Sequence, residues 1–214
     1  MMTANEKRYT PENAIKTDAG TDNTETSDSK MGSRRRHPAD DQNKIIHIFG
    51  CPNSGKTTLR KALAERHPDY QSYCIDDFRR RYGDGSFEGE SYAQIRFGDE
   101  MMKGGFFECS GTGMSTVCNL SAYRNRPQYI VVLDAPADDC ISRMVSGKYV
   151  GIPFPFPDTD EDYIWMVSIY LSSEMFDRVR RGIPTLWLDS DIPLDVQIEE
   201  VERFAGLEVE GMAE

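Results

Sequence analysis

The sequence predicts an α/β protein in which a parallel β-sheet is covered by helices on both faces. Short apolar runs that are typical of buried strands alternate along the chain with segments whose apolar residues have helical spacing. Strands that alternate with helices form parallel sheets, because each helix carries the chain back to the same edge. In addition, residues 50–58 (GCPNSGKTT) place a glycine loop between the first strand and the first helix. Open sheets of this kind bind ligands at the carboxyl ends of their strands.

Length and composition are consistent with one folded domain. Of the 214 residues 38% are hydrophobic, which suffices for a full core, and we assign this domain to residues 44–214. Residues 1–43 are polar and lack an apolar stripe, so we expect a disordered tail, in which Arg34–Arg36 is the concentrated charge. The longest apolar runs, near 45–49 and 130–133, are too short to span a membrane, and the N-terminus has no apolar leader segment. We therefore expect a cytoplasmic protein with no membrane partner.

The net charge of −11 disfavours nucleic acid as the main partner, although a local basic groove on an acidic body remains an alternative. The five cysteines are an odd number and form no C-x-x-C pair, which argues against a zinc site and a disulfide framework. We expect reduced, mostly buried thiols. A redox pair of Cys51 and Cys109, if both lie at the carboxyl edge of the sheet, is an open alternative. The sequence does not indicate the oligomeric state.

Five segments are predicted to be strands because they are rich in β-branched, aromatic and other apolar residues. They are residues 44–49, 71–75, 106–109, 128–134 and 184–188. The second of them delivers the sequence Asp-Asp-Phe-Arg, residues 76–79, at its carboxyl end.

Five helices are predicted from apolar spacing and end signals. The first follows the glycine loop and ends before Pro68; the second covers 91–103, with Tyr92, Ile95 and Met102 inward and Phe97 as a further candidate. A third begins near Pro136 and runs to Gly147.

The fourth predicted helix begins at a capping box formed by Thr159 and Asp162 and runs to Gly182. Its inward face is expected to carry Ile164, Val167, Leu171 and Met175. The last helix starts at Pro193 and is expected to bury Leu194, Ile198, Val201 and Ala205 before Gly206. Between the third and fourth helices, residues 148–157 contain three prolines at alternate positions, so we expect a lid or substrate-facing loop there.

The glycine loop matches the pattern G-x-x-x-x-G-K-[ST], which binds phosphates when it connects a strand to a helix. Its backbone N–H groups and the positive end of the helix dipole form a cradle for anions. Lys56 is expected to reach the β- and γ-phosphates and Thr57 to ligate Mg²⁺, which makes ATP and Mg²⁺ the predicted cofactors. The predicted nucleotide-binding residues are Gly50, Pro52, Asn53, Ser54, Gly55, Lys56, Thr57 and Thr58. The alternative is a glycine turn that binds nothing.

Residues 44–79 resemble the 5′-kinase domain of phage-type polynucleotide kinases and, more broadly, the P-loop kinases of small metabolites such as shikimate and gluconate. The resemblance rests on the glycine loop and on Asp-Asp-Phe-Arg after the second strand. It implies a P-loop NTPase-type three-layer sandwich with a five-stranded parallel sheet in the order 2-3-1-4-5, and ATP-dependent transfer to a hydroxyl. It also implies that Asp76 is the general base and that Arg79 holds a phosphate of the acceptor.

The residues themselves favour the same chemistry, because an acceptor hydroxyl needs a carboxylate within reach to take its proton. Asp76 is the candidate catalytic base and also a candidate for the magnesium site, and Asp77 is a candidate substrate contact. Either aspartate is alternatively a helix N-cap. Arg79 is a candidate substrate contact, with a solvated helix face as its alternative.

This chain departs from the polynucleotide-kinase pattern in two places. Glu108 and the residues after it stand where that family has an aspartate, so Glu108 is a candidate for positioning Mg²⁺ or an acceptor hydroxyl, or else a satisfied strand-end carboxylate. The lid region is poor in arginine, and Arg143, the candidate catalytic residue there, either clamps ATP or occupies a helix surface.

We therefore expect an ATP-dependent kinase that transfers the γ-phosphate to a hydroxyl of a small metabolite, nucleoside or nucleotide. A polynucleotide 5′-hydroxyl kinase and a regulatory nucleotide-binding NTPase are the alternatives. The acidic composition disfavours the first of these, and the Asp76-Asp77 pair argues against the second. The sequence does not identify the acceptor.

Overall fold

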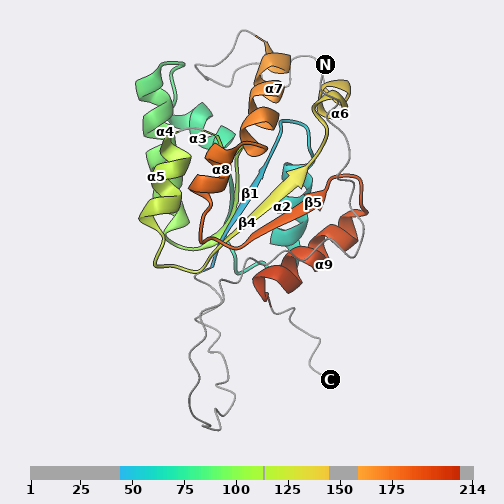
Figure 1. Cartoon of the computed structure of the whole chain (residues 1–214). Coiled ribbons are helices and arrows are strands. Elements are labelled where there is room, and N and C mark those ends of the chain that lie inside the picture. The colour runs from blue at the N-terminus through green and yellow to red at the C-terminus, as the bar shows by residue number, and fades with distance from the viewer. Residues whose placement is uncertain (1–43, 113, 145–158, 208–214) are drawn as a thin grey trace, which may run out of the picture. The chain divides into compact units, whose positions relative to one another are not determined.

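A computed structural model of the chain describes residues 44–112, 114–144 and 159–207 (Figure 1). Within these residues the strands form one parallel sheet in the order β2-β3-β1-β4-β5. The predicted fold class and strand order are therefore confirmed. The strands are β1 (Ile45–Gly50), β2 (Ser72–Cys74), β3 (Gly105–Glu108), β4 (Gln128–Asp134) and β5 (Thr185–Asp189). The expected tail at 1–43 and the expected lid at 148–157 lie outside the described residues.

The helices connect these strands and include two segments that the sequence analysis does not predict. They are α2 (Lys56–Arg66), α3 (Ile75–Tyr82), α4 (Phe87–Met101), α5 (Met114–Ala122), α6 (Ala137–Ser142), α7 (Asp160–Leu171), α8 (Glu174–Val179) and α9 (Leu194–Ala205). The helix α3 follows β2 without a loop, so Asp76 and Asp77 lie in the first turn of a helix, where acidic residues complement the helix dipole. The other unpredicted helix is α5.

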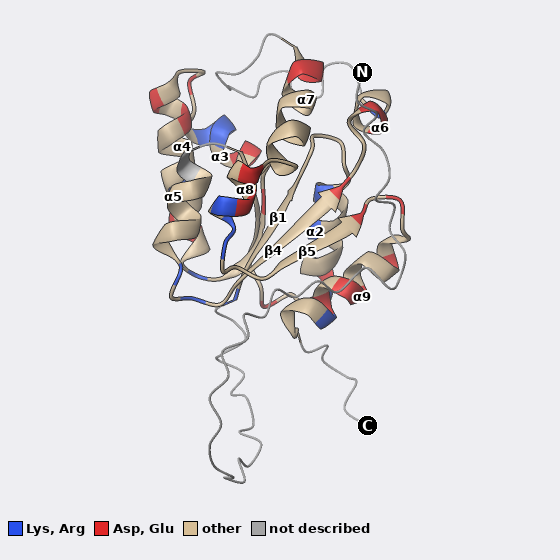
Figure 2. Ribbon diagram, viewed as in Figure 1, with Lys and Arg blue, Asp and Glu red and all other residues tan. Residues whose placement is uncertain are grey.

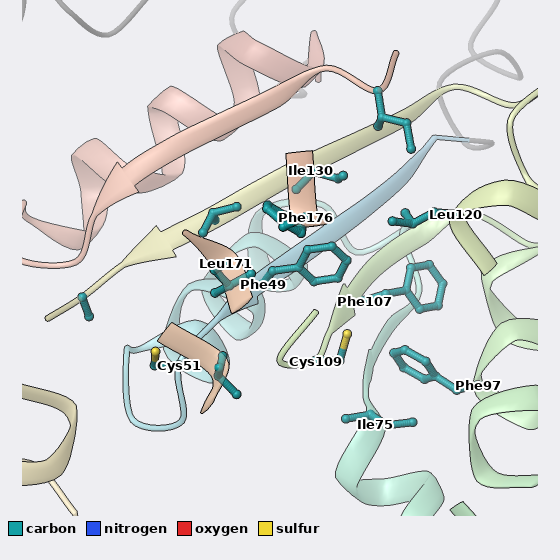
Figure 3. Close-up of a cluster of buried hydrophobic side chains, with 14 of the residues drawn as sticks. Phe49, Cys51, Ile75, Phe97, Phe107, Cys109, Leu120, Ile130, Leu171 and Phe176 are labelled. Atoms are coloured by element: carbon teal, nitrogen blue, oxygen red, sulfur yellow. The ribbon is translucent and has the colours of Figure 1, made fainter. Parts of the chain in front are cut away.

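The two faces of the sheet carry two separate apolar clusters, because successive side chains of a strand point to opposite faces. In β1, Ile45 and Phe49 face one cluster, whereas Ile46 and Ile48 face the other. The first cluster is covered by α4, α5, α7 and α8 (Figure 1), and Phe49 lies at its centre beside Phe107 of β3 and Phe176 of α8 (Figure 3). The second cluster is covered by α2 and α9.

The prediction for the inward face of α4 is wrong at three positions. Tyr92, Ile95 and Met102 are 51%, 59% and 59% exposed, whereas Phe97 is fully buried. The inward face instead carries Ala93, Phe97 and Met101 at four-residue spacing, together with the polar residues Glu90 and Gln94. Hydrophobicity alone selected the wrong face, because polar side chains on the true inward face have partners elsewhere in the fold.

The helix predicted from Thr159 to Gly182 is two helices, since the chain breaks at Ser172 and Ser173. The Ser173 hydroxyl accepts a hydrogen bond from the Phe176 N–H at 3.3 Å and so caps α8. This restart shifts the helical register, which buries Phe176 and leaves Met175 59% exposed. In α9, Leu194 is likewise 37% exposed and not buried as predicted, because it lies at the first position of the helix.

In the described part of the chain, every helix is too short or too polar to cross a membrane.

Candidate active site

The glycine loop joins the end of β1 to the start of α2, and its backbone requires glycine at two positions. Gly50 has a φ of 150°, and a Cβ there would lie 2.8 Å from the carbonyl oxygen of Leu133. Gly55 has the left-handed φ of 99° with no atom within 4 Å of a Cβ position, so the conformation and not crowding requires glycine. Asn53 is also left-handed, at a φ of 65°. The loop thus curls beneath the N-terminus of α2, where N–H groups lack intrahelical partners and attract anions.

Two side chains of the loop fit a bound polyphosphate. Lys56 is 8% exposed, and its ammonium donates a hydrogen bond to the Cys51 carbonyl at 2.5 Å, so the side chain lies across the loop. The buried hydroxyl of Ser54 has no hydrogen-bond partner among the described residues. A buried ammonium and an unpartnered hydroxyl beside a helix N-terminus match the negative charge and acceptor oxygens of the ATP phosphates.

A second group of residues suits a magnesium ion. The Thr57 hydroxyl donates a hydrogen bond to Glu108 Oε1 at 2.6 Å, and Arg60 donates to Glu108 Oε2 at 2.9 Å. A hydroxyl that donates its proton to a carboxylate keeps its oxygen lone pairs for a cation. The described residues contain no group of three or more His, Cys, Asp or Glu side chains suited to a metal. Mg²⁺ usually keeps water and phosphate oxygens as ligands beside one or two protein groups.

Asp76 belongs to a different, partly buried ion-pair group. Its Oδ1 accepts a hydrogen bond from Arg79 NH1 at 2.9 Å, and its side chain is 24% exposed. Arg79 is only 6% exposed and donates two further bonds, both of 2.9 Å, to the two carboxylate oxygens of Glu90. Burial lowers the pKa of the Arg79 guanidinium, but the hydrogen bonds with Glu90, together with the electrostatic influence of Tyr163, Glu90 and Asp76, raise the pKa above its usual value. Gln94 donates a further bond to Glu90 at 2.9 Å.

A row of hydroxyl groups lies next to this group. The Tyr163 hydroxyl of α7 donates to Ser110 Oγ at 2.9 Å, and Ser110 Oγ is hydrogen bonded to Thr112 Oγ1 at 2.9 Å. Burial raises the pKa of the Tyr163 phenol, so it remains a donor at neutral pH. Arg79 and Asp76 are close enough to Tyr163 to act on it electrostatically.

Strand register explains why these groups meet. Glu108, the last residue of β3, is paired with Ile48 of β1 on one side and Cys74 of β2 on the other. The glycine loop begins two residues after Ile48, and Asp76 lies two residues after Cys74. Parallel strands end at one edge, so the phosphate loop and Asp76 lie on either side of the end of β3. Cys109, which follows Glu108, is influenced electrostatically by both Arg79 and Lys56.

Comparison with known proteins identifies the fold. A gluconokinase from Sinorhizobium meliloti 1021 superposes with a TM-score of 0.54 at 16% identity, over 77% of this chain and 93% of that one. A sugar kinase from Janibacter sp. HTCC2649 gives a TM-score of 0.55 at 16% identity, over 77% and 95% of the two chains. A shikimate kinase from Acinetobacter baumannii in complex with shikimate gives 0.51 at 16% identity, over 78% and 97%. The chain has the P-loop kinase fold.

Sequence comparison adds nothing to this, since no family model matches the chain and no curated protein matches it. The likeness at 16% identity concerns the fold alone.

Two of the predicted site residues form ion pairs at the surface of this fold. Asp77 is on the outer side of α3, where it forms an exposed ion pair of 3.1 Å with Arg80. Arg143 follows α6 and forms an exposed ion pair of 2.8 Å with Asp191. The helix α6, which precedes Arg143, is hydrogen bonded to the phosphate loop, because the Asn53 amide donates to the Cys140 carbonyl at 3.2 Å. Arg143 therefore lies near the loop but at the surface.

The cysteines of the kinase fold are all free thiols. A hydrogen bond with Cys140 and burial raise the pKa of the Cys51 thiol, and the same hydrogen bond lowers the pKa of Cys140. The Cys51 thiol also donates a hydrogen bond to the Ile164 carbonyl at 3.7 Å. Burial raises the pKa of Cys109 to about 11.

Sequence reasoning missed Arg60, Glu90 and Tyr163. Arg60 lies one helical turn after Lys56, so a basic residue at that spacing beside a strand-end carboxylate was a usable signal. Glu90 and Tyr163 come from helices whose packing no local motif specifies. Their contribution becomes visible only in the folded chain.

Proposed function

We propose that this protein is an ATP-dependent kinase that transfers the γ-phosphate of ATP to a hydroxyl group of a small molecule. One observation carries the proposal. The end of β3, at Glu108, lies between two groups. The phosphate loop with Lys56 and Thr57 follows β1 on one side, and Asp76 follows β2 on the other. This arrangement supports in-line transfer, in which a donor phosphate and a base must flank the acceptor hydroxyl.

Each residue has a defined task in this proposal. Lys56 leaves the Cys51 carbonyl and binds the β- and γ-phosphate oxygens, where negative charge grows during transfer. Asp76 accepts the proton of the acceptor hydroxyl through Oδ2, since Oδ1 is bonded to Arg79. Thr57 binds Mg²⁺ through its hydroxyl oxygen, and Glu108 orients that hydroxyl. When bound, Mg²⁺ neutralises phosphate charge, and ATP supplies the phosphoryl group.

The surface charge supports a small acceptor over a polynucleotide. The chain carries a net charge of −11, and acidic side chains stand at the carboxyl ends of β4 and β5, Asp134 and Asp189 (Figure 2). Burial and the neighbouring Asp189 raise the pKa of Asp134. A polynucleotide backbone would meet repulsion at this edge. The solved structures that share the fold include a gluconokinase, a sugar kinase and a shikimate kinase, which supports the choice of a small hydroxylated acceptor.

The test is transfer of labelled phosphate from ATP to panels of sugars, polyols, nucleosides and 5′-hydroxyl oligonucleotides. We expect transfer to a small acceptor, and a loss of roughly 10²-fold or more in Lys56→Ala, as for removal of one group that stabilises transition-state charge. Lys61→Ala, a change at an exposed position of the same helix, serves as the control. Near-normal turnover in Lys56→Ala contradicts the role of the loop. Release of labelled phosphate to water alone favours the regulatory NTPase, and transfer to oligonucleotides alone favours the polynucleotide kinase.

A further inference from the structure

Arg79, the cation nearest to Asp76, is fully engaged within the protein. Its Nε and NH2 groups donate to Glu90 and its NH1 group donates to Asp76, each at 2.9 Å. Both Arg79 and Glu90 are less than a tenth exposed, and Gln94 fixes the Glu90 carboxylate from the other side. A guanidinium that forms two hydrogen bonds with one carboxylate keeps that partner. The bidentate hydrogen bonds are strong, and separating two buried charges would leave each of them unpaired.

The charges around Arg79 sum to a negative value. Asp76 and Glu90 contribute two negative charges and Arg79 one positive charge, while the neighbouring Tyr163, Ser110 and Thr112 are neutral. The other arginines of α3 face elsewhere: Arg80 pairs with Asp77, and the Arg81 guanidinium lies 5.2 Å from the ring centre of Tyr82. Lys56 is required by the nucleotide phosphates. An acceptor with a phosphate or carboxylate would therefore meet repulsion here and no available cation among the described residues.

We propose that Glu90 sets the charge class of the acceptor by occupying Arg79, so that the acceptor is an uncharged hydroxylated molecule such as a sugar, a polyol or a nucleoside. This inference rests on the proposed kinase function and narrows its substrate class. It replaces the role of Arg79 that the family resemblance implies, which is to hold a phosphate of the acceptor. Arg79 is instead a positioning residue that fixes the Asp76 carboxylate. The hydroxyl groups of Tyr163, Ser110 and Thr112 supply the donors and acceptors that a neutral, hydroxylated ligand needs.

Substitution of Glu90 by glutamine tests this directly. Glutamine keeps the size of the side chain but removes its negative charge. The positive charge of the buried Arg79 is then no longer neutralised by residue 90, so an added anion can pair with it. The matched control is Glu88→Gln, which makes the same change at an exposed position of the same helix. The double variant Glu90→Gln with Arg79→Gln shows whether any gain depends on Arg79.

Binding is measured by calorimetry on protein saturated with ADP and Mg²⁺, so that the phosphate loop is filled. The probes are two matched pairs: glucose with gluconate, and thymidine with thymidine 3′-monophosphate. In Glu90→Gln we expect the anionic member of a pair to bind roughly tenfold or more tighter than in wild type, the usual size of a hydrogen bond to a charged group. Glu88→Gln and the double variant should show no such gain.

Two results would overturn the inference. One is binding of gluconate or thymidine 3′-monophosphate to the wild type that Arg79→Gln abolishes. The other is a folded Glu90→Gln protein with no gain for either anion. If Glu90→Gln fails to fold, wild-type turnover decides: a higher kcat/KM for the anionic member of a pair contradicts the inference, and a higher value for the neutral member supports it. Calorimetry measures binding without turnover, so the two proposals are tested separately. If no acceptor is phosphorylated, the kinase proposal fails, and the binding results still test the role of Glu90.

Discussion

Asp76 and Asp77 are adjacent in the sequence but have different surroundings in the fold. Asp76 is three-quarters buried and bonded to a buried arginine, whereas Asp77 is 65% exposed and pairs with Arg80 at the surface. The helix α3 turns by about 100° per residue, so neighbouring side chains point in different directions. Of the two, only Asp76 is proposed to act on a ligand.

Isosteric substitutions separate the two aspartates. Asp76→Asn keeps the size of the side chain but removes the base, so we expect turnover to fall by roughly 10²–10⁴-fold with little change in ATP affinity. Asp77→Asn should leave turnover close to wild type, because the Asp77 side chain points to solvent. Its exposed ion pair with Arg80 contributes about 1 kcal/mol or less to stability. Steady-state kinetics and nucleotide titration measure both. Equal, modest losses would show that neither carboxylate is the base.

Glu108 accepts hydrogen bonds from Thr57, the candidate magnesium ligand, and from the buried Arg60. Its substitution therefore has two separable effects. Glu108→Gln weakens the orientation of the Thr57 hydroxyl, so we expect the Mg²⁺ concentration for half-maximal activity to rise by roughly 10–100-fold, as for other residues that orient metal ligands. It also leaves Arg60 without its charged partner, so the melting temperature should fall.

The two effects are read by different measurements, a magnesium titration of activity and a thermal melt. A lower melting temperature with unchanged magnesium dependence would show that Glu108 only supports the fold through Arg60.

At the scale of elements, the sequence predicts most reliably the features that one segment specifies. β4 has the predicted bounds, because a run of five aromatic and aliphatic residues, 129–133, lies between the end signals Pro127 and Pro136. The capping box is confirmed, since Thr159 Oγ1 accepts a hydrogen bond from the Asp162 N–H at 3.1 Å. The glycine loop was located from its residue spacing between a predicted strand and a predicted helix, and it does connect β1 to α2.

Features that depend on packing between elements were not predictable. The inward face of α4 includes Glu90 and Gln94, which look solvent-facing until α3 brings Arg79 against Glu90, to which Gln94 also donates a hydrogen bond. Arg79 and Glu90 are eleven residues apart on different helices, and no periodicity relates them. For this reason the sequence names candidate residues for the nucleotide side, which stay predictions, whereas it does not indicate the partners of Arg79.

Gly111 links the loop after β3 to the core, and a matched pair of substitutions tests that link. At Gly111 φ is 83° and a Cβ would lie 2.8 Å from the ring of Phe49, whereas at Gly182 φ is 81° and no atom lies within 4 Å of a Cβ position. Gly182→Ala should cost about 1–2 kcal/mol of stability for the left-handed backbone alone. Gly111→Ala should cost about 1–3 kcal/mol more, because it also forces the aromatic ring aside.

Chemical unfolding of both variants measures the difference. Equal losses would mean that the Phe49 ring moves without cost. We expect a larger loss of stability in Gly111→Ala, together with weaker acceptor binding. This result would indicate that contact with the core sets the position of the loop that contains Ser110 and Thr112.

At the scale of the whole molecule, the stability of the fold should depend on a histidine inside the sheet. His47 of β1 is 1% exposed and lies 3.0 Å from Gln128 Oε1, measured from its Nε2. The Gln128 amide nitrogen donates to the Leu120 carbonyl at 3.2 Å, which fixes Oε1 as the acceptor and so places the proton on His47 Nε2. The imidazole is thus a neutral donor in the native protein.

Burial lowers the pKa of His47 from 6.5 to about 4, and the hydrogen bond with Gln128 opposes that shift only in part. Between these two values the unfolded chain binds a proton that the native protein does not, so the free energy of unfolding falls as the pH falls through this window. The full stabilisation is present above pH 6.5 and its loss is complete below about pH 4, a difference of about 3 kcal/mol at 1.36 kcal/mol per pKa unit.

Substitution of His47 by glutamine isolates this contribution, because the variant retains the other titrating groups and has no imidazole in the core. Urea unfolding at about pH 7 and about pH 4.5 gives the change in stability for each protein, and the wild type should lose about 2–3 kcal/mol more than the variant over this interval. His47→Gln is expected to be less stable than the wild type at pH 7, so the comparison uses the pH dependence and not the absolute stability. The same pH dependence in both proteins would show that the pKa of His47 in the native state equals its value in the unfolded chain, and that the core of the sheet tolerates a charge beside Gln128.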